Sequence, residues 1–182
     1  MPVTSFKELE AADRDLLAGL FYRVGVWIGQ AEDVDGEEDD RLEAHAIRRI
    51  LESLAGSGTF GAFVQAAARQ TLDSGDRWPQ WADDTFDILP DVARARTILA
   101  RSLVKAERDR VVAALCEVAA GVAEAYGEFA GDEEVSEGFL SRVMGRIRDR
   151  IAGVESGSMN VSPAESAALE DLETTLRGGA AH

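Results

Sequence analysis

The sequence predicts an all-α fold with a single domain. Apolar residues recur at spacings of three and four along almost the whole chain, and no segment alternates as a half-buried strand does. With 182 residues, 46% of them hydrophobic, the chain is long enough to form one proper core. We expect a helical domain over residues 1–152, and a linker with a C-terminal helix over residues 153–182.

The first part of the chain predicts a short helix and then a long one. Ser5 and Glu8 have the spacing of a capping box, which indicates a first short helix. An apolar stripe then predicts a helix over about residues 12–32, and Gly36 breaks the run. The stripe consists of Leu16, Leu17, Leu20, Phe21, Val24, Trp27 and Ile28.

Two further helices are separated by glycines. Apolar stripes predict one helix over about residues 38–55 and another from Phe60 to Leu72. The segment between them is punctuated by Gly56, Gly58 and Gly61.

Two prolines mark helix starts in the middle of the chain. Trp78-Pro79 suits a first helical turn, and we expect a short helix that passes through Phe86 and Leu89. A new helix then begins near Pro90.

Two features of the central region leave alternatives open. The stretch 90–127 is either one helix or two helices with a break near Lys105. Trp78 and Trp81 either fill the core between the two halves of the domain or line a groove for a partner, where Trp and Arg are enriched.

The C-terminal region predicts two helices joined by a linker. The residues from Phe139 to Ile151 are amphipathic, and residues 153–161 are small and polar. Ser162-Pro163-Ala164-Glu165 combines an N-cap, a proline at the first helical position and a capping glutamate, so a last helix should run to about Arg177. This helix either packs back or reaches another subunit, through Leu169, Leu172 and Leu176.

The charge of the chain bounds its partners. There are 34 acidic and 19 basic residues, which gives a net charge of −15. Such a charge repels nucleic acid and anionic membranes and favours cations or basic proteins. No stretch approaches the apolar length of a membrane span, and the N-terminus has no apolar signal region, so we expect a cytoplasmic protein without membrane insertion.

Acidic residues concentrate in two corners that resemble each other. Residues 31–43 hold eight acids and one base, and residues 128–137 hold five acids and no base. When the chain is shifted by about 95 residues, Gly36 aligns with Gly131, and the apolar stripes before these glycines also align. The sequence therefore suggests a duplicated helical hairpin.

The acidic corners have two interpretations. Carboxylates in a first helical turn are stabilised by the helix dipole without any ligand. If the corners meet, they could instead bind calcium or magnesium, which take several oxygen ligands, although neither corner has the spacing of an EF-hand. The candidate ligands are Asp33, Asp35, Glu38, Glu128, Asp132 and Glu133.

The stretch Ala31-Glu32-Asp33-Val34-Asp35-Gly36-Glu37-Glu38-Asp39 between two amphipathic helices resembles the tellurite-resistance TerB-like family, whose members carry an Ala-Asp-Gly corner followed by glutamates. In this chain the corner reads Val34-Asp35-Gly36, and the resemblance covers about residues 12–151. It implies a compact bundle of about seven helices in two related halves. It also implies a binding module linked to metals or stress rather than an enzyme.

Three enzyme patterns are incomplete. Asp83-Asp84-Thr85-Phe86-Asp87 has the form DDxxD of prenyl-diphosphate enzymes, but no second copy exists. Glu133-Glu134-Val135-Ser136-Glu137 has the form EExxE of magnesium-dependent all-α nucleotide pyrophosphohydrolases, but the downstream ExxD is replaced by Glu170 through Glu173. Neither Cys116 nor His45 has a catalytic partner in the sequence, and we expect Cys116 to be a buried apolar residue.

The sequence thus favours a non-enzymatic TerB-like binding or scaffolding module that binds a protein partner, with a divalent cation at the acidic corners as a further expectation. The alternatives are a magnesium-dependent nucleotide pyrophosphohydrolase and a purely structural interaction module, and self-association into a homo-oligomer stays open.

Overall fold

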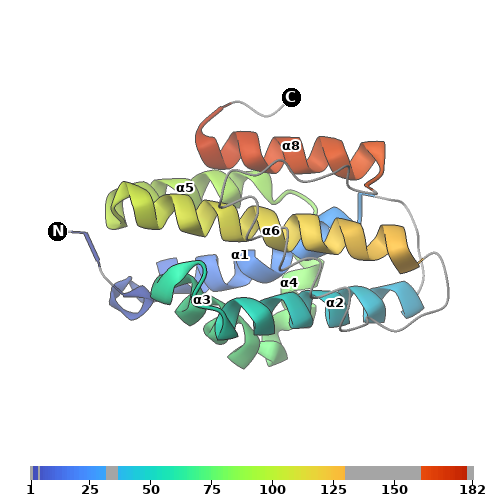
Figure 1. The fold of residues 1–182 in the computed structure, drawn as a ribbon, viewed down its shortest axis with the longest axis horizontal. Coiled ribbons are helices and arrows are strands. Elements are labelled where there is room, and N and C mark those ends of the chain that lie inside the picture. Colours follow the sequence, from blue (N-terminus) through green and yellow to red (C-terminus); the bar gives the residue numbers. More distant parts are fainter. Residues whose placement is uncertain (1, 4, 32–36, 130–160, 180–182) are drawn as a thin grey trace.

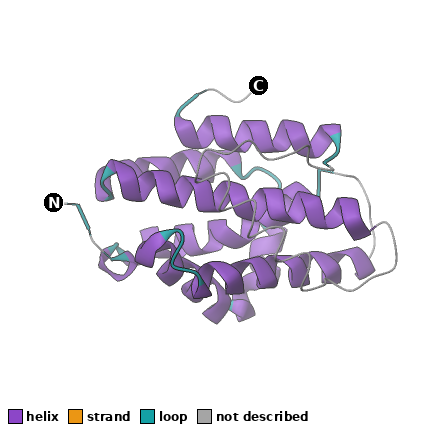
Figure 2. Ribbon diagram, viewed as in Figure 1, coloured by secondary structure: helices purple, strands orange, loops and turns teal. Residues whose placement is uncertain are grey.

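Seven α-helices and no strand make up the part of the chain that the computed structural model describes, residues 2–3, 5–31, 37–129 and 161–179 (Figure 2). The expected all-α fold is therefore confirmed. Two short 3-10 turns, η1 (Phe6–Glu8) and η2 (Gly75–Arg77), precede α1 and α4. The α-helices in chain order are α1 (Ala11–Gly29), α2 (Glu37–Gly56), α3 (Gly61–Asp73), α4 (Trp78–Asp83), α5 (Leu89–Ser102), α6 (Lys105–Phe129) and α8 (Pro163–Arg177).

Helix α1 runs through the middle of the bundle. It packs against α2, α3, α4, α5, α6 and α8, and every residue from Leu17 to Val26 is buried. The expected single stripe was therefore incomplete, because Ala18, Gly19, Arg23 and Gly25 on the other faces of α1 are buried as well. A helix that is buried on all sides belongs to the core of the protein.

The other helices surround α1 (Figure 1). The pair α2 and α3 packs on one side of α1, and α5 and α8 pack together on the opposite side. Helix α6 contacts both groups, and its longest interfaces are with α1 and α2. The buried apolar side chains of all these helices form one hydrophobic core.

A close approach of three helices requires a glycine in α1. A Cβ atom at Gly25 would lie 2.7 Å from Cγ1 of Ile47 on α2 and 3.3 Å from Cγ2 of Val122 on α6. Both distances are shorter than an ordinary carbon contact, so the absence of a side chain lets α2 and α6 meet α1 at this level.

The predicted helix ends near the C-terminus are confirmed. The Ser162 Oγ accepts from the Glu165 N–H at 3.2 Å, and the Glu165 carboxylate accepts from the Ser162 N–H at 2.9 Å, so the capping box is complete. Helix α8 ends at Gly178, whose φ of +98° lies in the left-handed region that favours glycine. Leu172 and Leu176 are buried, so this helix packs back onto the bundle.

The structure decides between the alternatives that the sequence left open for residues 90–127 and for the two tryptophans of the central region. Helix α5 ends at Ser102 and α6 begins at Lys105, so the stretch 90–127 contains two helices. Trp78 and Trp81 are both buried and belong to the hydrophobic core, as the first of the two alternatives expected. The Trp78 ring stacks on Tyr22 with the ring centres 4.6 Å apart.

The short helix expected through Phe86 was wrong. Helix α4 ends at Asp83, the next five residues are not helical, and α5 begins at Leu89 with Pro90 in its first turn. The physical reason is that tertiary hydrogen bonds engage the carbonyl of Asp84 and the hydroxyl of Thr85. The helix expected near residues 139–151 and the linker over 153–160 lie outside the described residues.

Candidate functional site

The predicted cation ligands lie mostly outside the described residues. This applies to Asp33, Asp35, Asp132 and Glu133, and to the side chains of Glu38 on α2 and Glu128 on α6. The start of α2 and the end of α6 lie at the same end of the bundle, but convergence of the carboxylates stays a prediction (Figure 1). In the described part of the chain, no group of three or more His, Cys, Asp or Glu residues is placed to hold a metal ion.

An exposed aromatic side chain stands out among the described residues. Phe86 is 97% exposed, whereas its neighbours Thr85 and Ile88 are buried. We call residues 84–88, between α4 and α5, the Phe86 loop. The loop is anchored by two buried side chains and directs a phenyl ring into solvent.

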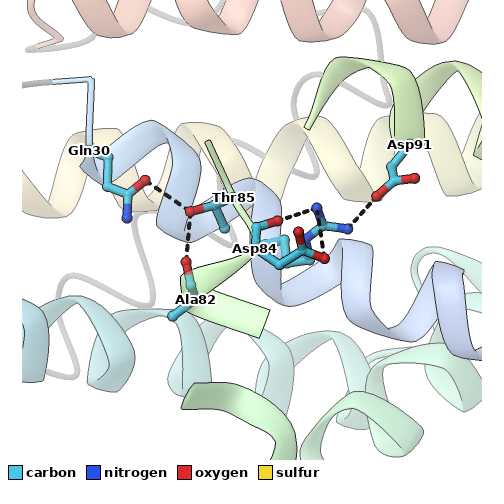
Figure 3. Close-up of polar contacts among 6 residues, drawn as sticks. Gln30, Ala82, Asp84, Thr85 and Asp91 are labelled. Carbon is cyan, nitrogen blue, oxygen red and sulfur yellow. Dashed lines mark hydrogen bonds and ion pairs between the residues drawn. The ribbon is translucent and has the colours of Figure 1, made fainter. Parts of the chain in front are cut away.

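Thr85 fixes the loop to the ends of two helices (Figure 3). Its hydroxyl lies 2.8 Å from the carbonyl oxygen of Ala82 in α4 and 2.9 Å from Oε1 of Gln30, directly after α1. The hydroxyl has one hydrogen, so it donates to one acceptor at a time. Both acceptors belong to well-formed helix ends, and the threonine therefore holds the loop against α1.

Arg23 of α1 fixes the same loop from inside the bundle. Its guanidinium donates to the carbonyl oxygen of Asp84 and, at 2.6 Å, to Oδ2 of Asp91 in the first turn of α5. The Asp84 carboxylate lies 3.8 Å from the same guanidinium. The Arg23 side chain is only 7% exposed, whereas the Asp91 and Asp84 side chains are 32% and 81% exposed, so the guanidinium reaches from inside the bundle to carboxylates at the surface. Charge-assisted hydrogen bonds of this kind are stronger than bonds between neutral groups.

A second ion pair ties η2, directly before α4, to α1 next to this site. The Arg77 guanidinium makes a bidentate contact with the Asp15 carboxylate, and it also lies over the Trp81 ring at 4.9 Å from the ring centre. The hydrogen bond from Arg77 holds the pKa of the Asp15 carboxyl below its usual range, and the same bond raises the pKa of Arg77.

The hollow between α1, α4 and α5 has a volume of about 290 Å³. Its charged walls are largely paired with each other, through Arg77 with Asp15 and through Arg23 with Asp84 and Asp91. The arrangement therefore stabilises the contact between these helices, and it offers no nucleophile with an adjacent base.

Three aspartates flank Phe86 in the sequence. Asp83, Asp84 and Asp87 are all exposed. The DDxxD pattern thus spans the end of α4 and the loop instead of one helix face, and the carbonyl oxygen of Asp84 is bonded to Arg23.

The remaining sequence candidates do not form a catalytic centre in the described residues. His45 is exposed on α2. Cys116 on α6 packs against the hydrophobic core as an apolar residue, as expected, but it is only half-buried. Glu170 and Glu173 lie on α8, and the EExxE pattern is outside the described residues. Sequence reasoning missed Phe86 because it was assigned to a helix; the signal was one aromatic residue among three aspartates, four residues before a proline.

Comparison of the chain with protein-family models, with curated proteins and with solved structures found no match. The described helices include none that is long and apolar enough to cross a membrane.

Proposed function

We propose that this protein is a non-enzymatic binding module that engages a protein partner through the Phe86 loop. The observation that carries the proposal is the 97% exposure of Phe86 on a loop that Arg23 and Thr85 hold in place. Aromatic residues are enriched in protein interfaces, and a few such anchors supply most of the binding free energy. Because the loop is already ordered, binding loses little conformational entropy.

The charge around the loop defines the chemistry of the partner. Asp83, Asp84 and Asp87 are exposed and lie within three residues of Phe86 in the sequence, and the whole chain carries a net charge of −15. In a partner with an apolar pocket bordered by Lys or Arg, the pocket would match the phenyl ring and the basic residues would match these carboxylates. Complementary charge of this kind raises the association rate, and this effect becomes smaller as the salt concentration rises.

The TerB-like role in metal or stress resistance, a cytoplasmic location and a divalent cation at the acidic corners belong to the same proposal. They are supported by the acid-glycine-acid corner at Asp35-Gly36-Glu37 and by the net negative charge. A cation there would act on the start of α2 and the end of α6. Its binding would not require the Phe86 loop.

The experiment compares Phe86→Ala with Val104→Ala in quantitative affinity capture from cell extract. Val104 is the matched control because it is also an exposed apolar residue, at 52%, in the turn between α5 and α6. A true partner should be lost with Phe86→Ala and retained with Val104→Ala. With that partner purified, Phe86→Ala should weaken binding by about 2 kcal/mol, or roughly 30-fold.

Two further measurements separate binding from folding. Phe86→Ala should leave the melting temperature almost unchanged, because the ring buries almost no area in the folded protein. Asp87→Asn should slow association at low salt and have little effect on dissociation. If every captured protein binds wild type and Phe86→Ala equally, the proposal is wrong.

A further inference from the structure

The structure contains a second cavity between α5, the first half of α6 and the end of α8. Its volume is about 690 Å³, which lies in the range of cavities that bind small organic molecules. One part of its wall is apolar, from Phe60, Val112, Ala113 and Leu176. The cavity is separate from the Phe86 loop, which contributes no residue to it.

Four basic side chains line this cavity although the protein as a whole is strongly acidic. They are Arg96 on α5, Lys105 and Arg108 on α6, and Arg177 on α8. Two of them are neutralised locally, because Lys105 pairs with Asp109 at 2.5 Å and Arg177 pairs with Glu173 at 2.6 Å. The third carboxylate in the wall, Glu117, is buried and already has an interaction of its own.

Arg96 and Arg108 are the two cations left over. Both are half-buried, and neither forms an ion pair or a side-chain hydrogen bond with the described part of the chain. Arg96 lies against the C-terminal end of α8, since its Nη1 is 2.8 Å from where a Cβ on Gly178 would be. The negative end of the helix dipole compensates only part of a charge. Both guanidinium groups therefore retain donors and positive charge for a ligand in the cavity.

We propose that this cavity binds an organic anion, with a carboxylate, sulfonate or phosphate head held by Arg96 and Arg108 and an apolar body against Val112 and Leu176. A guanidinium matches the planar oxygen pair of such a head and forms charge-assisted hydrogen bonds with it. The apolar wall gains from covering the body of the ligand. This proposal does not depend on the proposed protein partner.

Three probes of the full chain test the head and the body separately. Decanoate has the proposed anionic head and an apolar tail, decyltrimethylammonium has the same tail with a positive head, and inorganic phosphate has the head alone. Displacement of the fluorescent sulfonate anilinonaphthalene sulfonate reports the binding of each. Decanoate should displace the dye at least about ten times better than decyltrimethylammonium, and phosphate should act only weakly.

Matched variants locate the binding site. Arg96→Gln and Arg108→Gln should each weaken decanoate binding about 10-fold or more, and Arg108→Lys should retain part of it. The controls are Arg94→Gln on α5 and Arg110→Gln on α6, two exposed arginines that do not line this cavity. Far-UV circular dichroism establishes that each variant is folded. Equal displacement by the two decyl compounds, or equal decanoate binding by cavity and control variants, overturns the proposal.

Discussion

Arg23 is a charged residue in the interior of the bundle, with only 6% of its surface exposed. Its partners are the carbonyl oxygen of Asp84 and the carboxylate of Asp91, which belong to the loop after α4 and to the start of α5. An arginine in the middle of a helix is ordinarily a surface residue, so nothing in the residue pattern of α1 indicates that Arg23 lies in the core. Its burial explains why the chain leaves the helical conformation at Asp84.

Replacing Arg23 with methionine keeps most of the side-chain volume but removes the donors. The Asp84 carbonyl and the half-buried Asp91 carboxylate would lose their partner, and we expect the free energy of unfolding to fall by about 2–3 kcal/mol. Urea denaturation followed by circular dichroism measures this change.

The control for this variant is Arg49→Met on α2. The Arg49 side chain is 36% exposed and pairs with Glu52 at 3.2 Å one helical turn away. A pair of this kind contributes less than about 1 kcal/mol, so the control should change stability very little. Equal losses in the two variants would contradict a special role for Arg23.

Helix α1 depends on glycine for its contacts with neighbouring helices. Gly25 leaves room for Ile47 and Val122, and Gly19 lets the Trp81 ring approach to 3.2 Å from the position of a Cβ. In the sequence these two glycines look like weak points of a helix, because glycine is unfavourable in a helix interior. Their function becomes visible only when the positions of α2, α4 and α6 are known.

Gly25→Ala should destabilise the protein by about 1–3 kcal/mol, because the added methyl group overlaps Ile47. Gly56→Ala at the end of α2 is the control: no atom lies within 4 Å of the new Cβ. That change should be neutral or slightly stabilising, through the lower entropy of the unfolded chain. Thermal unfolding by scanning calorimetry checks both. A Gly25→Ala protein as stable as the Gly56→Ala protein would show that the helices can separate without loss.

At the level of helices, local sequence signals predicted where helices begin and end better than they predicted which side chains are buried or exposed. The capping residues Ser162 and Glu165 could be read from the sequence because they act within one turn, whereas the break before Lys105 was only one of two alternatives. The Phe86 loop could not be predicted in this way, because its conformation depends on a hydrogen bond from Arg23, which lies more than sixty residues earlier in the chain. For the candidate site, the sequence supplied the acidic rim but not the fixed position of the ring.

The molecule as a whole carries a charge of −15, which produces repulsion among its carboxylates. Raising sodium chloride from about 20 mM to about 200 mM should therefore raise the melting temperature, because salt screens this repulsion. Magnesium or calcium at equal ionic strength separates screening from binding. A larger rise with the divalent ion is expected if the acidic corners hold one.

The variant Asp35→Asn with Glu133→Gln tests the location of that cation. The double variant should lose the extra stabilisation by magnesium or calcium and keep the response to sodium chloride. A divalent ion that stabilises wild type no more than sodium chloride does would rule out the cation site and leave the protein-binding proposal unaffected.

The central place of α1 has a consequence for synthesis on the ribosome. This helix emerges before all the helices that enclose it, and the last two of these, α6 and α8, end at Phe129 and Arg177. About 150 residues separate the end of α1 from the end of α8, so at about 5–20 residues per second its apolar residues lack their full set of neighbours for roughly 7 to 30 s. During that interval the nascent chain presents Leu17, Phe21 and Val24 to its surroundings, and it is then most in need of a chaperone.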